Sequence, residues 1–328
     1  MLTDKFGRTI TYLRLAVIDR CNLRCTYCMP EHGLAWLNRT ELMSLPEMAR
    51  LCGLFAQLGV EKFRITGGEP FLRKDLLPFL QQISQLTDVR EITITTNGLL
   101  TAKYIPELTK LGIRSVNLSL DSLNDDRFFQ ITRRRELSKV LHTPLELLAH
   151  DIQVKINTVV IGRQNMEDIL PLVDLTRTLP VSVRFIEEMP FNGDTFIREQ
   201  PWTAQQIVDY IQQHHPTLIQ MQAEPHATSE RYKIPGYRGD IGVIAAFTRS
   251  FCGDCNRLRL TPTGVLRTCL YQSDGINLKD SIRSGKTDLQ LIELIKRAVM
   301  DKAKDGWAAE KESRSVSATN QSMAMIGG

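Results

Sequence analysis

The sequence contains no long hydrophobic run. No stretch of about 18 consecutive apolar residues, the length that spans a membrane as a helix, occurs among its 328 residues. The first residues also lack the apolar core of a secretory signal peptide. We therefore expect a cytoplasmic protein without a membrane partner. Its 42% of hydrophobic residues is ample for a large buried core.

The sequence also lacks a strong excess of charge of either sign. It has 41 basic and 37 acidic residues, which gives a net charge of +4. So small a charge does not argue for general nucleic-acid binding, and no nucleic acid is expected as a partner. An anionic ligand would have to be held by a local group of Arg and Lys.

Cysteines are few, and their number, seven, is odd. In a long chain without an export signal, this favours metal ligation over a disulfide framework. Cys52 lies in an apolar helical pattern and is expected to be a buried thiol. The other six form two triads, with the spacings C-x3-C-x2-C (Cys21, Cys25, Cys28) and C-x2-C-x13-C (Cys252, Cys255, Cys269).

Each triad is one thiolate short of a closed metal site. Three thiolates can hold a cubane iron-sulfur cluster and leave its fourth iron open for chemistry. A structural zinc site normally wants four protein ligands, and the first triad offers only three cysteines. We favour clusters, but a zinc site stays an alternative, completed at the second triad by a distant ligand such as His226.

The first two-thirds of the sequence alternates between β-rich and helical patterns. This rhythm predicts parallel strands with crossover helices, an α/β fold with a partial (β/α)6 TIM-type barrel over residues 1–225. Residues 226–328 are expected to form a C-terminal extension with the second triad, a substrate-binding region and a mobile tail. The predicted strands are 13–18, 62–66, 91–95, 115–120, 154–161 and 181–186.

Unusual residues follow five of these strands directly. In barrels of this kind the carboxyl ends of the strands carry the active site, so we expect these segments to meet there. They are Asp19-Arg20-Cys21, Gly67-Gly68-Glu69-Pro70, Thr96-Asn97-Gly98, Asp121-Ser122 and Glu187-Glu188-Met189.

The first triad, followed by the Gly-Gly-Glu-Pro turn after the next strand, resembles the radical S-adenosylmethionine (SAM) enzymes. From about Leu13 to the last residue, the sequence resembles one family among them, the GTP 3′,8-cyclases of molybdenum cofactor biosynthesis. This second resemblance is carried by Leu13-Arg14-Leu15, residues 64–70, 95–98, 117–121 and 184–187, the second triad and the final Gly327-Gly328.

The resemblance implies S-adenosylmethionine and two [4Fe-4S] clusters as cofactors, with the six triad cysteines as cluster ligands. It also implies that S-adenosylmethionine contacts Tyr27, Gly68, Ser119 and Met189. In this family a 5′-deoxyadenosyl radical takes hydrogen from C3′ of GTP, and the C3′ radical attacks C8 of the guanine, which the second cluster binds. The product is (8S)-3′,8-cyclo-7,8-dihydroguanosine 5′-triphosphate.

The family also implies partners besides GTP. An electron donor must reduce the clusters, and a cyclic pyranopterin monophosphate synthase must take up the product. Homodimerisation is left open as a further interaction.

GTP is expected to bind basic residues, because a triphosphate brings about three to four negative charges and Arg and Lys suit phosphate oxygens. These basic residues could instead pair with acids such as Glu61, Glu187 or Glu188, or point to solvent. The resemblance implies substrate contacts at Arg14, Lys62, Arg64, Thr95, Lys155, Arg184, Arg257, Leu258 and Arg259.

Two other functions stay open. A radical SAM enzyme that modifies peptides could use the second triad for an auxiliary cluster, although such enzymes generally carry more C-terminal cysteines. A non-catalytic zinc protein could use Arg257 and Arg259 to contact nucleic acid.

Two further features of the sequence are a run of three arginines and the C-terminal ending. The run Arg133-Arg134-Arg135 replaces a pattern in which the family often has a glycine before a single arginine, and we expect a solvated loop there. The ending Gly327-Gly328 resembles the family's C-terminus, which reaches into the active site.

Overall fold

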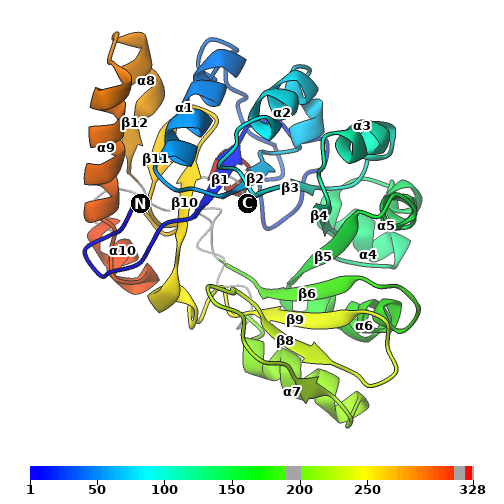
Figure 1. The fold of residues 1–328 in the computed structure, drawn as a ribbon. Helices are drawn as coiled ribbons and strands as arrows, with labels where there is room; N and C mark the ends of the chain where they lie inside the picture. The colour runs from blue at the N-terminus through cyan, green and yellow to red at the C-terminus, as the bar shows by residue number, and fades with distance from the viewer. Residues whose placement is uncertain (190–200, 273, 314–321, 327–328) are drawn as a thin grey trace.

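The fold is an α/β structure built on one continuous sheet. The computed structural model describes residues 1–189, 201–272, 274–313 and 322–326 (Figure 1). Its twelve-stranded sheet has the order β12-β11-β10-β1-β2-β3-β4-β5-β6-β9-β8-β7. The six central strands, all parallel, are β1 (Tyr12–Ala16), β2 (Lys62–Thr66), β3 (Glu91–Thr96), β4 (Ser115–Ser119), β5 (Gln153–Val160) and β6 (Ser182–Glu187).

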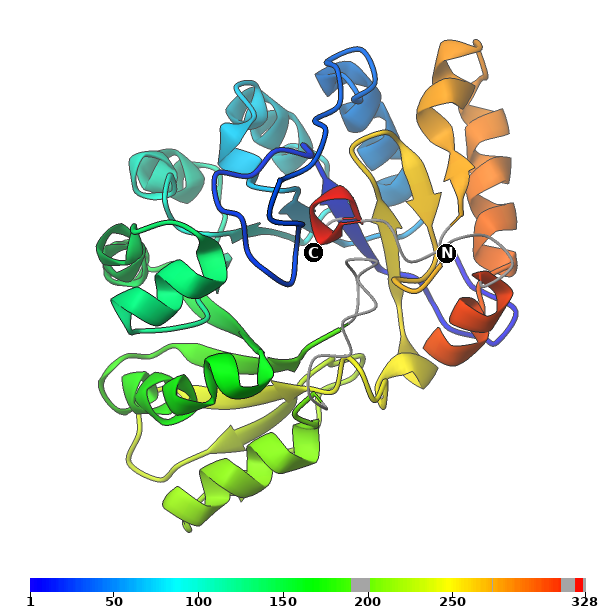
Figure 2. The same cartoon turned by 180° about the vertical axis from the view of Figure 1, so that it is seen from behind.

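Helices cover the outer face of this curved sheet (Figures 1 and 2). The capping box of α1 shows why they begin where they do, since the side chains of Ser44 and Glu47 each bind the other's backbone N–H. The helices of the barrel are α1 (Leu45–Gln57), α2 (Leu76–Ser84), α3 (Ile105–Lys110), α4 (Asp125–Thr132), α5 (Leu137–Ala149) and α6 (Ile169–Thr178). Short 3-10 turns occur at η1 (Pro70–Leu72), η2 (Ala102–Tyr104), η3 (Gly162–Gln164), η4 (Met166–Asp168) and η5 (Cys252–Asp254).

Residues beyond the sixth strand extend the same sheet on both sides. Strand β9 pairs in parallel with β6, and β10 pairs in parallel with β1. The strands are β7 (Ile219–Gln220), β8 (Glu230–Lys233), β9 (Asp240–Ile244), β10 (Arg257–Leu260), β11 (Val265–Arg267) and β12 (Ile276–Asn277). The helices are α7 (Ala204–His214), α8 (Leu278–Arg283), α9 (Asp288–Met300), α10 (Gly306–Ser313) and α11 (Met323–Ile326).

The predicted partial barrel is confirmed, with more parallel strands than the six expected. The predicted boundary at residue 225 stays a prediction, although strands from both sides of it share one sheet. Within the described residues, no helix combines the length and the apolar character needed to cross a membrane.

Alternation along the strands separates the core from the barrel interior. In β1, Leu13 and Leu15 are fully buried in the hydrophobic core, and Arg14 between them lines a cavity. The same holds in β2 for Phe63 and Ile65 on either side of Arg64. Because side chains alternate between the faces of a strand, the apolar residues pack under the helices and the arginines turn into the barrel. Cys52 is fully buried in this core, as predicted.

Candidate active site

The first triad lies on the long loop after β1, and α4 holds this loop in place. Backbone N–H groups of Arg24 and Thr26 donate to the carbonyls of Thr132 and Ile131 at 3.0 and 2.9 Å. Arg133, which caps α4, donates to the carbonyl of Arg24 at 2.9 Å. The expectation of a solvated loop was therefore wrong for Arg133, whose guanidinium supports the cysteine loop, and right for the exposed Arg134 and Arg135.

The Gly-Gly-Glu-Pro turn fixes the start of the same loop. The N–H groups of Gly68 and Glu69 donate to the carbonyls of Ile18 and Arg20, both at 2.8 Å. A Cβ atom on Gly68 would lie 2.2 Å from the carbonyl oxygen of Arg20, so no other residue fits without moving the loop. Glu69 is buried and accepts from the N–H of Asn97 at 2.8 Å, which ties the turn to the end of β3.

The carboxylates at the strand ends are buried and used within the protein. Asp121 accepts from the hydroxyl of Tyr27 at 2.8 Å and from the N–H of Val159 at 2.8 Å. Burial raises the pKa of Asp121 to about 6 and that of Glu69 to about 7. Both acids lie beside the first triad, since Glu69 raises the pKa of Cys21 and Asp121 that of Cys25, in addition to the larger effect of burial.

Another buried carboxylate, Glu187, fixes the segment that precedes the second triad. It accepts from the N–H of Ala204 at the start of α7, at 2.6 Å, and from those of Phe247 and Thr248, both at 2.7 Å. Glu187 therefore does not neutralise the cavity arginines. Cys252 and Cys255 follow in η5 and its C-cap, and Cys269 comes after β11.

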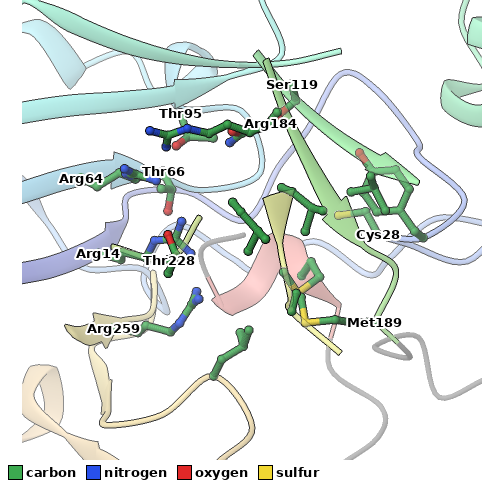
Figure 3. A pocket seen from close by; sticks show the side chains of 18 of the residues that line it. Arg14, Cys28, Arg64, Thr66, Thr95, Ser119, Arg184, Met189, Thr228 and Arg259 are labelled. Carbon is green, nitrogen blue, oxygen red and sulfur yellow. The ribbon is translucent and has the colours of Figure 1, made fainter. Parts of the chain in front are cut away.

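Both triads line one cavity. Its volume is about 300 Å³, and all six triad cysteines contribute to its wall. The residues predicted to contact S-adenosylmethionine, Tyr27, Gly68, Ser119 and Met189, line it as well. Figure 3 shows Arg14, Arg64 and Arg259 turned into the pocket from neighbouring strands, with Cys28 and Met189 on the opposite side.

The described thiols do not form a closed site for a single metal ion. Among the described residues, no three His, Cys, Asp or Glu side chains come close enough to hold one metal ion. A zinc ion needs its thiolates about 2.3 Å from one centre, whereas a cubane cluster holds them farther apart. His226 does not supply a fourth ligand to the second triad through Nδ1, since this atom lies 2.9 Å from Asp254.

Burial acts on the thiols of both triads. It raises the pKa of Cys21 to about 12, and it raises those of Cys25, Cys252 and Cys269 as well. The pKa of Cys255 is lowered instead, because Lys302 and Arg257 outweigh the effect of burial. A thiol with a raised pKa is protonated when free, and a bound metal centre would displace its proton. Asn97 Nδ2 already lies 3.7 Å from Cys21 Sγ, which places a hydrogen-bond donor at a thiolate of the first site.

Three arginines of the first cavity lie without acidic partners in the described part of the chain. Among the described residues, none of Arg14, Arg64 and Arg184 forms an ion pair, and the Nε atom of each is buried without a hydrogen bond. Burial, together with the neighbouring arginines, lowers the pKa of Arg64 to about 10. Burial also lowers the pKa values of Arg257 and Arg259. Such uncompensated charge is costly, and a bound polyanion would remove the cost.

A second cavity of about 830 Å³ continues the basic wall. It shares Arg64, Arg184 and Arg257 with the first cavity and adds Lys62 and Lys155. Lys62 Nζ lies 2.5 Å from a carboxylate oxygen of Glu91. The alternative that a basic residue pairs with an acid therefore holds for Lys62, although Glu91 was not among the acids named for it. The wall as a whole has room and charge for an extended anion.

Two predicted substrate residues differ in their placement. Thr95 lines the first cavity, and its buried hydroxyl has no hydrogen-bond partner. The side chain of Leu258 packs in the hydrophobic core and lines neither cavity. Since Arg257 and Arg259 flank it on a strand, alternation turns Leu258 away from the ligand, and only its backbone is left for the predicted contact.

The sequence analysis missed Tyr12 and Asn157. Both line the first cavity, and the hydroxyl of Tyr12 and Oδ1 of Asn157 are buried without partners. Burial would raise the pKa of Tyr12, but Arg64, Arg14 and Lys62 outweigh it and lower this pKa to about 8. The signal used for the arginines, a polar residue within an otherwise apolar strand, would also have identified Tyr12 and Asn157.

The described part of the C-terminal tail reaches the same cavity. Met323 lines it, the hydroxyl of Ser322 donates to the carbonyl of Cys28, and Arg259 donates to the carbonyl of Ile326 at 3.3 Å. Figure 2 shows α11 against the inner side of the barrel. Gly327 and Gly328 lie outside the described residues.

Comparisons with known families divide the chain into two matches. Residues 15–176 match the Radical SAM superfamily, and residues 181–307 match the family Molybdenum Cofactor Synthesis C. Together these ranges contain both triads and every basic residue of the cavities except Arg14.

Several curated proteins are similar over most of this chain. The "GTP 3',8-cyclase" of Clostridium perfringens strain 13 is 38% identical over 92% of this chain and 93% of its own length. The "GTP 3',8-cyclase, mitochondrial" of Arabidopsis thaliana is 40% identical over 92% of this chain and 78% of its own length. The "Molybdenum cofactor biosynthesis protein 1" of Dictyostelium discoideum is 40% identical, and this chain spans about half of it, 49%.

Among solved structures, Streptococcus suis SuiB bound to S-adenosylmethionine has a similar fold. The TM-score is 0.67 over 97% of this chain and 77% of SuiB, with 15% sequence identity. At this identity the likeness concerns the fold alone.

Proposed function

This chain belongs to the GTP 3′,8-cyclase family of radical SAM proteins, and on that premise we propose that it converts GTP to (8S)-3′,8-cyclo-7,8-dihydroguanosine 5′-triphosphate. This reaction would be the first step of molybdenum cofactor biosynthesis. The family implies S-adenosylmethionine and [4Fe-4S] clusters as cofactors.

One observation carries the proposal: the two cysteine triads line one cavity together with Arg14, Arg64 and Arg184, whose Nε atoms are buried without hydrogen bonds. We assign Cys21, Cys25 and Cys28 to the first cluster, and Cys252, Cys255 and Cys269 to the second. When bound, the first cluster and S-adenosylmethionine would supply the electron and the hydrogen-abstracting radical. The residues of the chain hold, orient and shield the reactants.

The basic wall would hold the triphosphate. Arg14, Arg64 and Arg184 offer guanidinium forks at the first cavity, and Lys62 and Lys155 offer point charges in the second. With the triphosphate anchored there, the guanine would lie toward the second triad and the ribose toward the first. Thr95, Arg257, Arg259 and the backbone of Leu258 complete the proposed substrate contacts.

S-adenosylmethionine would lie against the carboxyl ends of the strands. We assign its contacts to Tyr27, Gly68, Ser119 and Met189, which all line the cavity. The hydrogen bond between Tyr27 and Asp121 fixes the tyrosine ring, and α11 helps to exclude water from a radical formed there.

The two alternatives are less well supported. A peptide-modifying radical SAM enzyme finds support only in fold likeness, because SuiB has also been solved "bound to precursor peptide SuiA" at 15% identity. A zinc protein that binds nucleic acid disagrees with the spacing of the thiols and with arginines that face inward.

The test is an anaerobic incubation of reconstituted protein with GTP, S-adenosylmethionine and a reductant. We expect about eight irons per chain, 5′-deoxyadenosine, and a fluorescent pterin after oxidation. Variants in which alanine replaces Cys252, Cys255 or Cys269 should still cleave S-adenosylmethionine but should form no cyclised product. Iron for one cluster only, or cyclisation by these variants, would refute the proposed role of the second triad.

The partners follow from the reaction. We propose an electron donor, a cyclic pyranopterin monophosphate synthase that consumes the product, and no nucleic acid or membrane partner; homodimerisation stays open. The cytoplasmic location stays a prediction, and the printed name of the Arabidopsis relative assigns that protein to mitochondria.

A further inference from the structure

Lys302 is a buried lysine beside the second triad. It lies in the chain between α9 and α10, and only 2% of it is exposed. It belongs to neither motif that identified the site and does not line either cavity. A lysine this deeply buried needs a reason, since isolated buried charge is strongly unfavourable.

The contacts of Lys302 Nζ account for a full ammonium group. Nζ donates to Sγ of Cys255 at 3.8 Å, to the carbonyl of Arg257 at 3.2 Å, and to the carbonyl of Thr268. Three acceptors require three N–H donors, which an ammonium has and a neutral amine lacks. One side chain thus connects the segment of Cys255 with the segment that precedes Cys269.

The anion that balances this charge is the thiolate site itself. Within the described ranges no carboxylate lies in ion-pair distance of Lys302, whereas the nearby Arg8 pairs with Asp4 at 2.6 Å. Cys255 is the one acceptor among the three contacts of Nζ that can carry a full negative charge. Burial of the lysine is therefore understandable if Cys255 is a thiolate that ligates a cluster.

The first triad has buried acids beside it instead. In addition to the larger effect of burial, Glu69 raises the pKa of Cys21 and Asp121 raises that of Cys25. Nearby net charge and hydrogen bonds to cluster sulfurs set the reduction potential of a cluster. A positive charge and an N–H···S bond both favour the reduced, more negative state.

We propose that Lys302 is a positioning residue for the second cluster, which holds Cys255 as a ligand and raises the reduction potential of that cluster. The inference rests on the proposed function, because it needs a cluster at Cys252, Cys255 and Cys269. It adds a residue to that function, one that makes the second cluster easier to reduce than it would be without the lysine.

The test measures a potential in full-length protein. In a background where alanine replaces Cys21, Cys25 and Cys28, only the second cluster is assembled, and its midpoint potential is titrated by electron paramagnetic resonance. Lys302→Met should lower the equilibrium constant for one-electron reduction at least tenfold, a shift of about 59 mV or more. Lys302→Arg, which keeps the charge, should restore most of it.

The matched control is Lys279, a second buried lysine. It is 7% exposed, donates to the carbonyl of Glu41 at 2.7 Å and lies 3.5 Å from a carboxylate oxygen of Asp280, and neither contact involves a triad cysteine. Lys279→Met should leave the potential of the cluster unchanged. If Lys302→Met does not assemble the cluster, Lys302→Gln, which keeps a donor but no charge, is titrated in its place with the same expected fall.

The outcomes separate the two proposals. A second cluster whose potential is the same with Lys302→Met or Lys302→Gln overturns the role of Lys302 and leaves the cyclase intact. A background protein that binds no iron although it is folded overturns the second cluster, and with it the proposed function. Equal shifts with Lys279→Met would show that the loss of any buried lysine suffices, and would also overturn the inference.

Discussion

Arg64 shows at the residue scale how binding is favoured at the expense of folding. Its side chain is buried beside Arg14 and Arg184, and no described carboxylate pairs with it. The free protein bears the unfavourable energy of this desolvated charge, and the bound triphosphate would remove it. Removal of the charge should therefore have opposite effects on stability and on affinity.

Arg64→Met tests this opposition. The loss of charge-assisted hydrogen bonds, roughly 1.5–3 kcal/mol, should weaken GTP binding by about 10- to 150-fold in anaerobic calorimetry. The free energy of unfolding of the ligand-free protein should stay the same or rise. Arg90→Met is the control, because Arg90 is exposed and pairs with Glu61, and both quantities should stay unchanged. Unaltered GTP affinity of Arg64→Met would exclude Arg64 from the phosphate site.

Lys155 gives a prediction about pH. Burial has the largest effect on its pKa, and the charges of Arg184, Lys62 and Arg64 add to that effect. Together they lower the pKa of Lys155 to about 8. In the free protein Lys155 therefore loses its charge as the pH rises through about 8, and the GTP affinity should fall there by up to about tenfold per pH unit. Calorimetric titrations at several pH values would measure this fall.

The free energy of unfolding depends on pH in the opposite direction to the GTP affinity. Between about pH 8 and the ordinary pKa of 10.5, the unfolded chain binds more protons at Lys155 than the folded protein, so this group makes stability rise with pH. Lys155→Met should bind GTP more weakly at neutral pH and lose the fall near pH 8. Lys139→Met, at an exposed lysine that pairs with Glu136, should keep the fall.

At the scale of elements, the turn after β2 and the loop after β1 form one unit. The backbone of Gly68 and Glu69 is hydrogen-bonded to that of Ile18 and Arg20, so the first triad depends on a neighbouring strand for its geometry. The Gly-Gly-Glu-Pro motif is more than a turn, because the two backbones approach too closely for any side chain.

Gly68→Ala should displace the cysteine loop. The added Cβ would lie 2.2 Å from the carbonyl oxygen of Arg20, and both atoms in conflict are fixed to backbone. Iron analysis after reconstitution should fall from about eight to about four per chain, since only the second triad would be intact. Gly53→Ala is the control, because nothing lies within 4 Å of its added Cβ in α1, and it should be neutral or stabilising by up to about 1 kcal/mol. Full iron content in Gly68→Ala would contradict the argument.

At the scale of the whole molecule, the C-terminal part completes the barrel that the N-terminal part begins. Strand β9 covers the edge of β6, and β10 covers the edge of β1, each by parallel pairing. Parallel strands are stable when both neighbours are present, and a bare edge invites aggregation. We therefore expect the two matched regions to fold as one unit.

A chain that ends at residue 225 tests this unity. It would lose β8 to β12 and expose the edges of β1 and β6, so we expect aggregation or loss of the cooperative thermal transition seen with the full chain. Circular dichroism and size-exclusion chromatography would measure both. A control that ends at residue 313 lacks only the tail and keeps every strand, and it should unfold cooperatively. A stable, monomeric fragment 1–225 would show that the predicted boundary separates independent domains.

The sequence by itself determined the barrel, the two triads and the basic residues in the strands. These are local signals: β-strands alternate with helices, cysteines recur at fixed spacing, and charges such as Arg14 interrupt apolar runs. The family resemblance then implied which of them serve one reaction. The sequence did not predict that Arg133 supports the cysteine loop, that Leu258 faces the core, or that Tyr12 and Asn157 line the cavity.

Only the tertiary structure decided that the triads share one cavity and that Lys302 lies against Cys255. Residues 21 and 252 are far apart in the chain, and the parallel pairing of β1 with β10 brings their segments together. The partner of Lys302 likewise depends on how α9 packs against β11. Local patterns carry no information on such distant pairings, because burial and electrostatic balance arise only when the whole sheet is assembled.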